Sequence, residues 1–126
     1  MIRKILIVDD SPISRKILKS CIPKDREYEF VEAGDGLAAV ESYKKQQPDV
    51  TFMDLTMPVM DGITSLAEIR KYDAAAVVIV LTADIQTKSI DKALNAGALL
   101  VVKKPPTRER IQDALSKAES VRRKTP

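Results

Sequence analysis

The chain contains no histidine and one cysteine among its 126 residues. The absence of histidine excludes imidazole chemistry, and with a single cysteine a zinc site is a poor expectation. Cys21 has no second cysteine to pair with, so an internal disulfide is excluded. We expect Cys21 to be a buried thiol beside Leu18 and Ile22, in a protein of the reducing cytoplasm.

Long apolar segments and glycine-rich loops are also missing, and basic residues gather only in a short run at the end of the chain. The N-terminus passes directly into a short apolar run, which predicts neither a signal peptide nor a membrane span. No Walker-type loop is present, so a nucleotide is a poor candidate for the ligand. The net charge is only +3 and the lysines and arginines are scattered, so we expect no nucleic-acid partner and no membrane partner.

Short apolar runs alternate with helical patterns along the chain. The runs predict five strands, over residues 5–8, 28–32, 50–53, 77–81 and 99–102. The first and fourth runs are fully apolar, as in parallel strands covered on both faces, whereas the second is mixed and indicates an edge strand. Five helices alternate with the strands, which predicts an α/β fold with a parallel sheet wrapped on both sides.

Helix boundaries are marked by capping residues. Ser11 followed by Pro12 predicts the start of the first helix, and Thr107 the start of the last. In the first helix Ile13, Ile17 and Cys21 recur on one face, which we expect to be buried. We place one domain over residues 1–121 and a short basic tail, or the stub of a linker, over residues 122–126.

Polar side chains follow four of the predicted strands at their carboxyl ends. Asp9 and Asp10 follow the first strand, Asp54 the third, Thr82 the fourth and Lys104 the fifth. Parallel strands place these ends at one edge of the sheet, where ligands bind in such folds. Clustered carboxylates repel one another unless a cation lies among them, and Mg²⁺ prefers oxygen ligands. An aspartate can also carry an acyl phosphate, so the set predicts phosphoryl transfer.

These residues carry a resemblance to a known family. The chain resembles the receiver domains of two-component response regulators, in particular single-domain chemotaxis-type regulators, from its first strand to its last helix. The resemblance rests on the motifs Ile7-Val8-Asp9-Asp10, Met53-Asp54-Leu55-Thr56-Met57-Pro58, Asp61-Gly62, Leu81-Thr82-Ala83, Ala96-Gly97-Ala98 and Lys104-Pro105. It implies a doubly wound five-stranded parallel sheet of strand order 2-1-3-4-5 with helices on both faces, the flavodoxin-like receiver fold.

The resemblance also implies a magnesium site and an acceptor residue. Asp54 is the expected phosphoacceptor. Asp10, Asp54 and the backbone carbonyl of Thr56 are the expected direct ligands of Mg²⁺, with Asp9 acting mainly through water.

The phosphoryl group has its own set of expected contacts. The side chains of Thr82 and Lys104, and the backbone amides of Thr56 and Ala83, are expected to contact it. Lys103 precedes Lys104, but successive strand residues face opposite ways, and the position of Pro105 favours Lys104. In the family the bond before this proline is often cis.

The resemblance names the kinds of partner as well. The donor is expected to be a phosphohistidine on a sensor histidine kinase or a histidine phosphotransfer protein, because this chain has no histidine of its own. Phosphorylation is expected to change the affinity of the face formed by helix four, strand five and helix five for an output protein. Thr56 and Asp84 are expected to tune the lifetime of the phosphoryl group. The chain is expected to act as a monomer or as a phosphorylation-dependent dimer.

Two alternatives stay open. The first is a pseudo-receiver, a binding module whose carboxylates do not react, although the full set of five side chains argues against it. The second is an enzyme of the aspartyl-phosphate hydrolase class. That class has an Asp-x-Asp arrangement after strand one, whereas here the first strand ends in adjacent aspartates. We therefore expect a signalling switch with limited self-catalysed phosphorylation and hydrolysis.

Val101 provides a test of the switch. Family members commonly carry an aromatic residue three positions before the motif lysine, and here that position is a valine. In the family, the inward or outward rotamer of that aromatic side chain reports the state of the switch. Valine has no comparable change of rotamer, so we expect a muted or altered switch. A substitution such as Val101→Ala should change the affinity for the output partner more than the rate of phosphorylation, with both measured on one preparation. Equal losses of affinity and rate would contradict this expectation.

Overall fold

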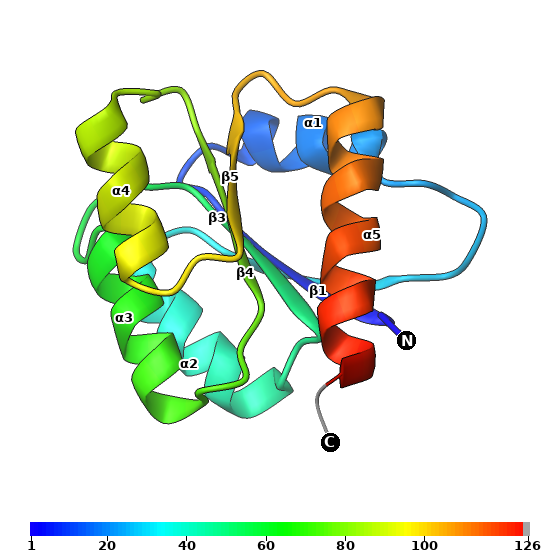
Figure 1. Cartoon of the computed structure of the whole chain (residues 1–126), viewed down its shortest axis with the longest axis horizontal. Helices are drawn as coiled ribbons and strands as arrows, with labels where there is room; N and C mark the ends of the chain where they lie inside the picture. The colour runs from blue at the N-terminus through cyan, green and yellow to red at the C-terminus, as the bar shows by residue number, and fades with distance from the viewer. Residues whose placement is uncertain (125–126) are drawn as a thin grey trace.

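The computed structural model describes residues 1–124 and shows a five-stranded parallel sheet between two layers of helices (Figure 1). The strands are β1 (Lys4–Val8), β2 (Glu29–Ala33), β3 (Val50–Met53), β4 (Val78–Thr82) and β5 (Leu100–Lys103). All four neighbouring pairs are parallel, and the order is β2-β1-β3-β4-β5. The expected fold class and strand order are therefore confirmed.

Two cores lie on opposite faces of the sheet. The helices are α1 (Pro12–Cys21), α2 (Gly36–Gln46), α3 (Gly62–Tyr72), α4 (Thr87–Asn95) and α5 (Arg108–Lys124). Residues of α1 and α5 pack with alternate residues of the central strands in one core, and residues of α2, α3 and α4 pack with the remaining strand residues in the other. Both faces of β1, β3 and β4 are thus covered, which explains their continuous apolar sequences.

Side-chain caps start the helices where the sequence predicts. The Ser11 hydroxyl accepts a hydrogen bond from the Ser14 amide, and the Thr107 hydroxyl accepts one from the Arg110 amide. Asp61 caps α3 in the same way, through the Thr64 amide. Each cap satisfies a backbone donor that the first helical turn leaves unpaired.

The predicted buried face of α1 is wrong in part. Cys21 is buried as expected, and its thiol lies 3.7 Å from the carbonyl oxygen of Pro106. Ile13 and Ile17, however, are 72% and 44% exposed, and Leu18 is the other buried residue of this helix. The ten-residue helix carries two apolar stripes, so its rotation is decided by packing against α5 and the sheet, which receive Leu18 and Cys21.

The C-terminal boundary also differs from the prediction. The basic tail was expected from residue 122, but α5 continues to Lys124, and Arg122 forms a 2.9 Å ion pair with Asp49. This contact joins the end of α5 to the segment before β3. Residues 125–126 of the expected tail lie outside the described residues. Within residues 1–124, no helix has the length and apolar character needed to cross a membrane.

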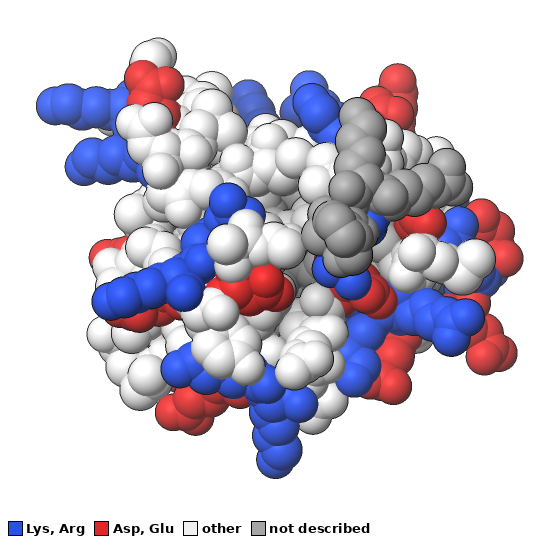
Figure 2. Space-filling model, turned by 60° about the horizontal axis from the view of Figure 1, so that its bottom comes forward, with Lys and Arg blue, Asp and Glu red and all other residues white. Residues whose placement is uncertain are grey.

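Charges of both signs are interspersed on the molecular surface. On the face shown in Figure 2, lysine and arginine side chains lie among aspartates and glutamates, with apolar and neutral side chains between them. Among the described residues, oppositely charged side chains also form ion pairs, for example Lys4 with Glu29 and Arg15 with Glu32. This face therefore carries no broad field of one sign of the kind that draws nucleic acid.

Thr51 in β3 offers a stability test. Its hydroxyl is the buried side-chain polar atom that lacks a hydrogen-bond partner among the described residues. Because burying an unsatisfied hydroxyl is costly, Thr51→Val should raise the free energy of unfolding by about 1 kcal/mol in urea denaturation. The exposed Thr64→Val is the control and should change it by less than about 0.5 kcal/mol. Destabilisation by Thr51→Val would show that the hydroxyl has a partner.

Candidate functional site

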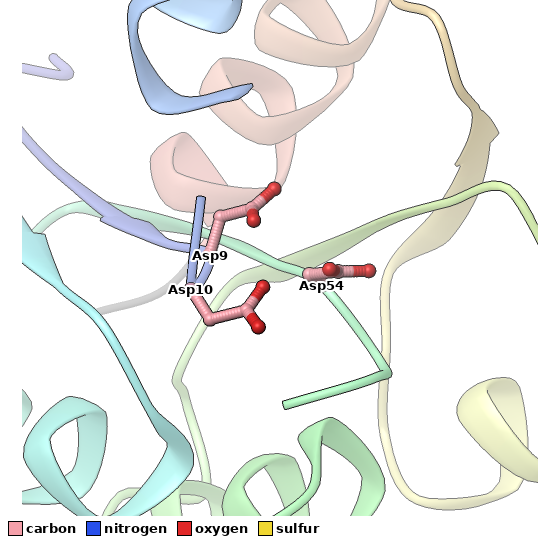
Figure 3. Close-up of side chains that lie close together, drawn as sticks. All are labelled: Asp9, Asp10 and Asp54. Carbon is pink, nitrogen blue, oxygen red and sulfur yellow. The ribbon is translucent and has the colours of Figure 1, made fainter. Parts of the chain in front are cut away.

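Three carboxylates meet at the carboxyl edge of the sheet. Asp9 and Asp10 follow β1, Asp54 follows β3, and one oxygen from each lies within 4.8 Å of the others. Figure 3 shows the three side chains leaving these neighbouring strand ends for a shared space. Backbone hydrogen bonds fix the strand ends, since the Asp54 amide donates to the Val8 carbonyl at 3.0 Å. The parallel register of β1 and β3 therefore brings the predicted carboxylates together.

Lys104 is the cation of this cluster. Its Nζ lies 2.6 Å from Asp9 Oδ2 and 3.3 Å from Asp54 Oδ2. Lys103, by contrast, is exposed, so the structure places Lys104 beside these carboxylates. The Lys104–Pro105 peptide bond is cis, as the resemblance implied.

Burial and charge shift the titration of this pair. Burial raises the pKa of the Asp54 carboxyl above its ordinary value, the Lys104 charge opposes this shift, and nearby Asp9 adds to it. Burial lowers the pKa of Lys104, but the hydrogen bond to Asp9 and the charge of Asp54 outweigh burial, so the net pKa is raised. The two carboxylates therefore favour the charged form of Lys104, and the Lys104 charge opposes the rise in the Asp54 pKa.

The carboxylates differ in what already contacts them. Asp9 is 5% exposed and accepts from the Ser11 amide at 2.9 Å through Oδ1 and from Lys104 through Oδ2. Asp54 is 9% exposed, and its Oδ1 accepts from the Leu55 amide at 2.8 Å. Within the described residues, the exposed carboxylate of Asp10 has no hydrogen bond or ion pair. Three carboxylates with one ammonium leave net negative charge, so this donor set fits Mg²⁺.

Gly62 allows α3 to start directly against the end of β3. Its amide donates to the Leu55 carbonyl at 2.9 Å. A Cβ at this position would lie 2.1 Å from the Asp54 carbonyl oxygen and 2.7 Å from Leu55 Cα. The sequence marked Asp61-Gly62 as a helix start, but it gave no sign of this close approach. Gly62 is thus a site residue that sequence reasoning did not explain.

Thr82 lies at the end of β4, where the sequence predicts it. It is buried, and its Oγ1 accepts a 3.1 Å hydrogen bond from the Asp84 amide. Asp84 in turn accepts from the Ser89 hydroxyl at 2.6 Å and the Gln86 amide at 3.1 Å. The Ser89 hydrogen bond, followed by that of the Gln86 amide, holds the pKa of the Asp84 carboxyl below its ordinary value. Thr82 is therefore linked to the first turn of α4 and makes no hydrogen bond to the described carboxylates.

The remaining predicted residues lie on exposed loops at the same edge. Thr56 follows β3 and Ala83 follows β4, and both are exposed. Val59, in the loop after Thr56, has a φ of 69°, a left-handed conformation that is rare for a β-branched residue.

Arg15 is a residue near the site that the sequence reasoning missed. Its guanidinium donates to the carbonyl oxygen of Asp9 at 2.5 Å. Its Nε also donates to Glu32 Oε1 at 2.8 Å. No sequence motif signals these contacts, because the one with Asp9 depends on how α1 lies beside the end of β1, and the one with Glu32 depends on β2 lying beside β1.

Comparisons with known proteins agree on one family. The response regulator receiver domain matches residues 5–116. The chemotaxis protein CheY of Bacillus subtilis is 41% identical over 117 residues, which cover 93% of this chain and 98% of that protein. CheY of Thermotoga maritima is 41% identical over 115 residues, covering 91% and 96%. A chain of the CheX–CheY–BeF₃–Mg²⁺ complex of Borrelia burgdorferi superposes with a TM-score of 0.86 at 32% identity, covering 93% of this chain and 89% of that one.

Substitution of Gly62 tests the tight start of α3. The added methyl group of Gly62→Ala must displace the Asp54 backbone, so the free energy of unfolding should fall by about 2–3 kcal/mol. Urea denaturation measures this loss.

Gly34→Ala is the matched control for that experiment. A Cβ at Gly34 would meet nothing closer than Arg15 Nη1 at 4.0 Å. This substitution should leave the free energy of unfolding unchanged or raise it by up to about 1 kcal/mol. Equal behaviour of the two variants would contradict the role assigned to Gly62.

Proposed function

Because the chain belongs to the response regulator receiver domain family, we propose that it is a phosphoacceptor switch of a two-component system, with Asp54 as the acceptor. The observation that carries this proposal is the cluster of Asp9, Asp10 and Asp54 with the Lys104 ammonium 3.3 Å from Asp54. The donor is a phosphohistidine of a sensor histidine kinase or a histidine phosphotransfer protein. We also propose a cytoplasmic location, which suits the unpaired, buried Cys21.

Mg²⁺ is the cofactor that fits this donor set. Asp10, Asp54 and the Thr56 carbonyl are the proposed direct ligands, and Asp9 acts through water. The contacts support this division, since both Asp9 carboxylate oxygens already accept hydrogen bonds whereas Asp10 has none. When bound, Mg²⁺ neutralises charge on the carboxylates and on the phosphoryl oxygens.

The transfer step needs little beyond positioning and charge. One Asp54 oxygen attacks phosphorus, an O–P bond forms, and the N–P bond to the donor imidazole breaks with its electron pair returning to nitrogen. Lys104 contacts a phosphoryl oxygen as a point charge and loses part of its contact with Asp54. The Thr56 and Ala83 amides, on the loops after β3 and β4, donate to the other oxygens.

The signal passes from Thr82 to the face formed by α4, β5 and α5. The phosphorylated side chain carries roughly −1.5 to −2 charges in place of the single carboxylate charge of Asp54, and its phosphoryl oxygens draw the Thr82 hydroxyl toward them. In the structure this hydroxyl accepts from the Asp84 amide, so its movement removes a contact with the segment before α4. The conformational equilibrium of that face shifts, and with it the affinity for a protein partner. Thr56 and Asp84 tune how long the phosphoryl group lasts.

Two further points of the proposal concern activity and assembly. Any catalysis is limited to the chain's own phosphorylation and dephosphorylation, and the chain acts as a monomer or as a phosphorylation-dependent dimer. The alternative is a pseudo-receiver, which has the same carboxylate cluster but binds partners without phosphorylation. The following experiment distinguishes the two.

Intact-protein mass measurement tests the proposal. After incubation with Mg²⁺ and a small-molecule phosphodonor, the wild type should gain one phosphoryl group. The gain should vanish with chelator and in Asp54→Asn, which removes the nucleophilic oxygen without changing the shape of the side chain. If the wild type gains no mass although circular dichroism shows that it is folded, the phosphoacceptor proposal is wrong and the pseudo-receiver is favoured.

A further inference from the structure

Arg15 connects three elements beside the carboxylate cluster. It lies on α1, its Nη1 donates to the Asp9 carbonyl at 2.5 Å, and its Nε donates to Glu32 of β2 at 2.8 Å. The second oxygen of Glu32 accepts from Lys19, also on α1, at 2.6 Å. The hydrogen bond from Lys19 lowers the pKa of the Glu32 carboxyl most, burial opposes this shift, and the hydrogen bond from Arg15 adds to it. The net pKa of Glu32 lies below its ordinary value. Glu32 is therefore a charged anchor that fixes the direction of the Arg15 guanidinium.

With Arg15 in place, every polar group of Asp9 has a partner. Its amide donates to the Ala33 carbonyl at 3.1 Å, and its carboxylate oxygens accept from the Ser11 amide and Lys104. Its carbonyl accepts from Arg15. Asp9 is thus immobilised on all sides, whereas the next residue, Asp10, has no side-chain partner within the described chain.

The Asp9 carbonyl belongs to the peptide group that leads into Asp10. Because a peptide group is planar, holding the carbonyl oxygen fixes the direction in which the Asp10 Cα leaves. The direction of that bond sets where the Asp10 carboxylate lies relative to Asp54. The hydrogen bond from Arg15 therefore acts on the one carboxylate of the cluster that nothing else holds.

We propose that Arg15 is a positioning residue for the Asp10 carboxylate and thereby for Mg²⁺ affinity. This inference rests on the magnesium site of the proposed function. Arginine suits the role because its planar fork offers two donors at a fixed angle, one for Glu32 and one for the Asp9 carbonyl. The Arg15 side chain is 18% exposed, and its bond to the Asp9 carbonyl is partly buried, whereas its bond to Glu32 lies at the surface.

Paired variants separate positioning from ordinary stabilisation. Arg15→Lys keeps the charge but loses the fork, and its dissociation constant for Mg²⁺ should rise about tenfold, the lower end of the effect of removing a partner of a metal ligand. Lys19→Gln breaks the other ion pair of Glu32 without touching Asp9, and should change the dissociation constant by less than about twofold. Arg15→Lys leaves the net charge unchanged, and removing the Lys19 charge can only favour cation binding, so a change in net charge would weaken Mg²⁺ binding in neither variant.

Isothermal titration with Mg²⁺ alone, on the full chain, gives the readout, and urea unfolding with chelator gives the metal-free stability. Weaker binding by Arg15→Lys but not by Lys19→Gln, at similar stabilities, supports the inference. Wild-type binding with unchanged affinity in Arg15→Lys, or equal weakening in both variants, overturns it and leaves the proposed function intact. A wild type that binds no Mg²⁺ overturns both.

Glu32→Gln keeps the test decisive if Arg15→Lys does not fold. This substitution keeps Arg15 but removes the charge of Glu32, so the contact that orients the Arg15 guanidinium is weaker. It should weaken Mg²⁺ binding more than Lys19→Gln does, and equal affinities of these two variants would overturn the role of Arg15.

Discussion

The contact of the Lys104 ammonium with Asp9 and Asp54 is the interaction on which the site depends. Three carboxylates within 4.8 Å repel one another, and partial burial strengthens that repulsion. Lys104 directly follows β5, while β4 and β3 lie between β5 and β1. A long, flexible side chain is therefore needed to reach from the outer strand to Asp9, and a lysine provides it. The ammonium keeps the resting cluster compact without occupying the side of Asp10.

The sheet topology determines which residues can take part. The chain moves outward from β1 to β2, returns to β3 on the other side of β1, and then continues to β4 and β5. Adjacent loops therefore diverge at β1 and β3, which opens the carboxyl edge there, where ligands bind in doubly wound folds. The two strands at this opening carry Asp9, Asp10 and Asp54. Gly62 completes the arrangement because it lets α3 begin against Asp54 without a clash.

Much of the fold followed from local patterns. The apolar runs predicted all five strands to within one or two residues, and the caps at Ser11 and Thr107 marked helix starts that the structure confirms. The predictions that were wrong concerned features that depend on packing between elements and not on local sequence patterns. The two apolar stripes of α1 are equally good in sequence, and only packing against α5 buries Leu18 and leaves Ile13 in solvent. Likewise, nothing in a basic C-terminal sequence reveals that Asp49 pairs with Arg122 at the end of α5.

The sequence by itself determined the kind of chemistry available at the site. It supplied carboxylates, a hydroxyl and an ammonium immediately after strands, and parallel strands end at the same edge whatever their order. Only the tertiary structure decided which of these groups are already bonded and which stay free. Asp9 is held by Ser11 and Arg15, which follow it closely in the chain, and by Lys104, which comes from the far side of the sheet, whereas Asp10 is left open. The Lys104 contact joins residues distant in sequence and depends on the order of the strands, so no local pattern can encode it.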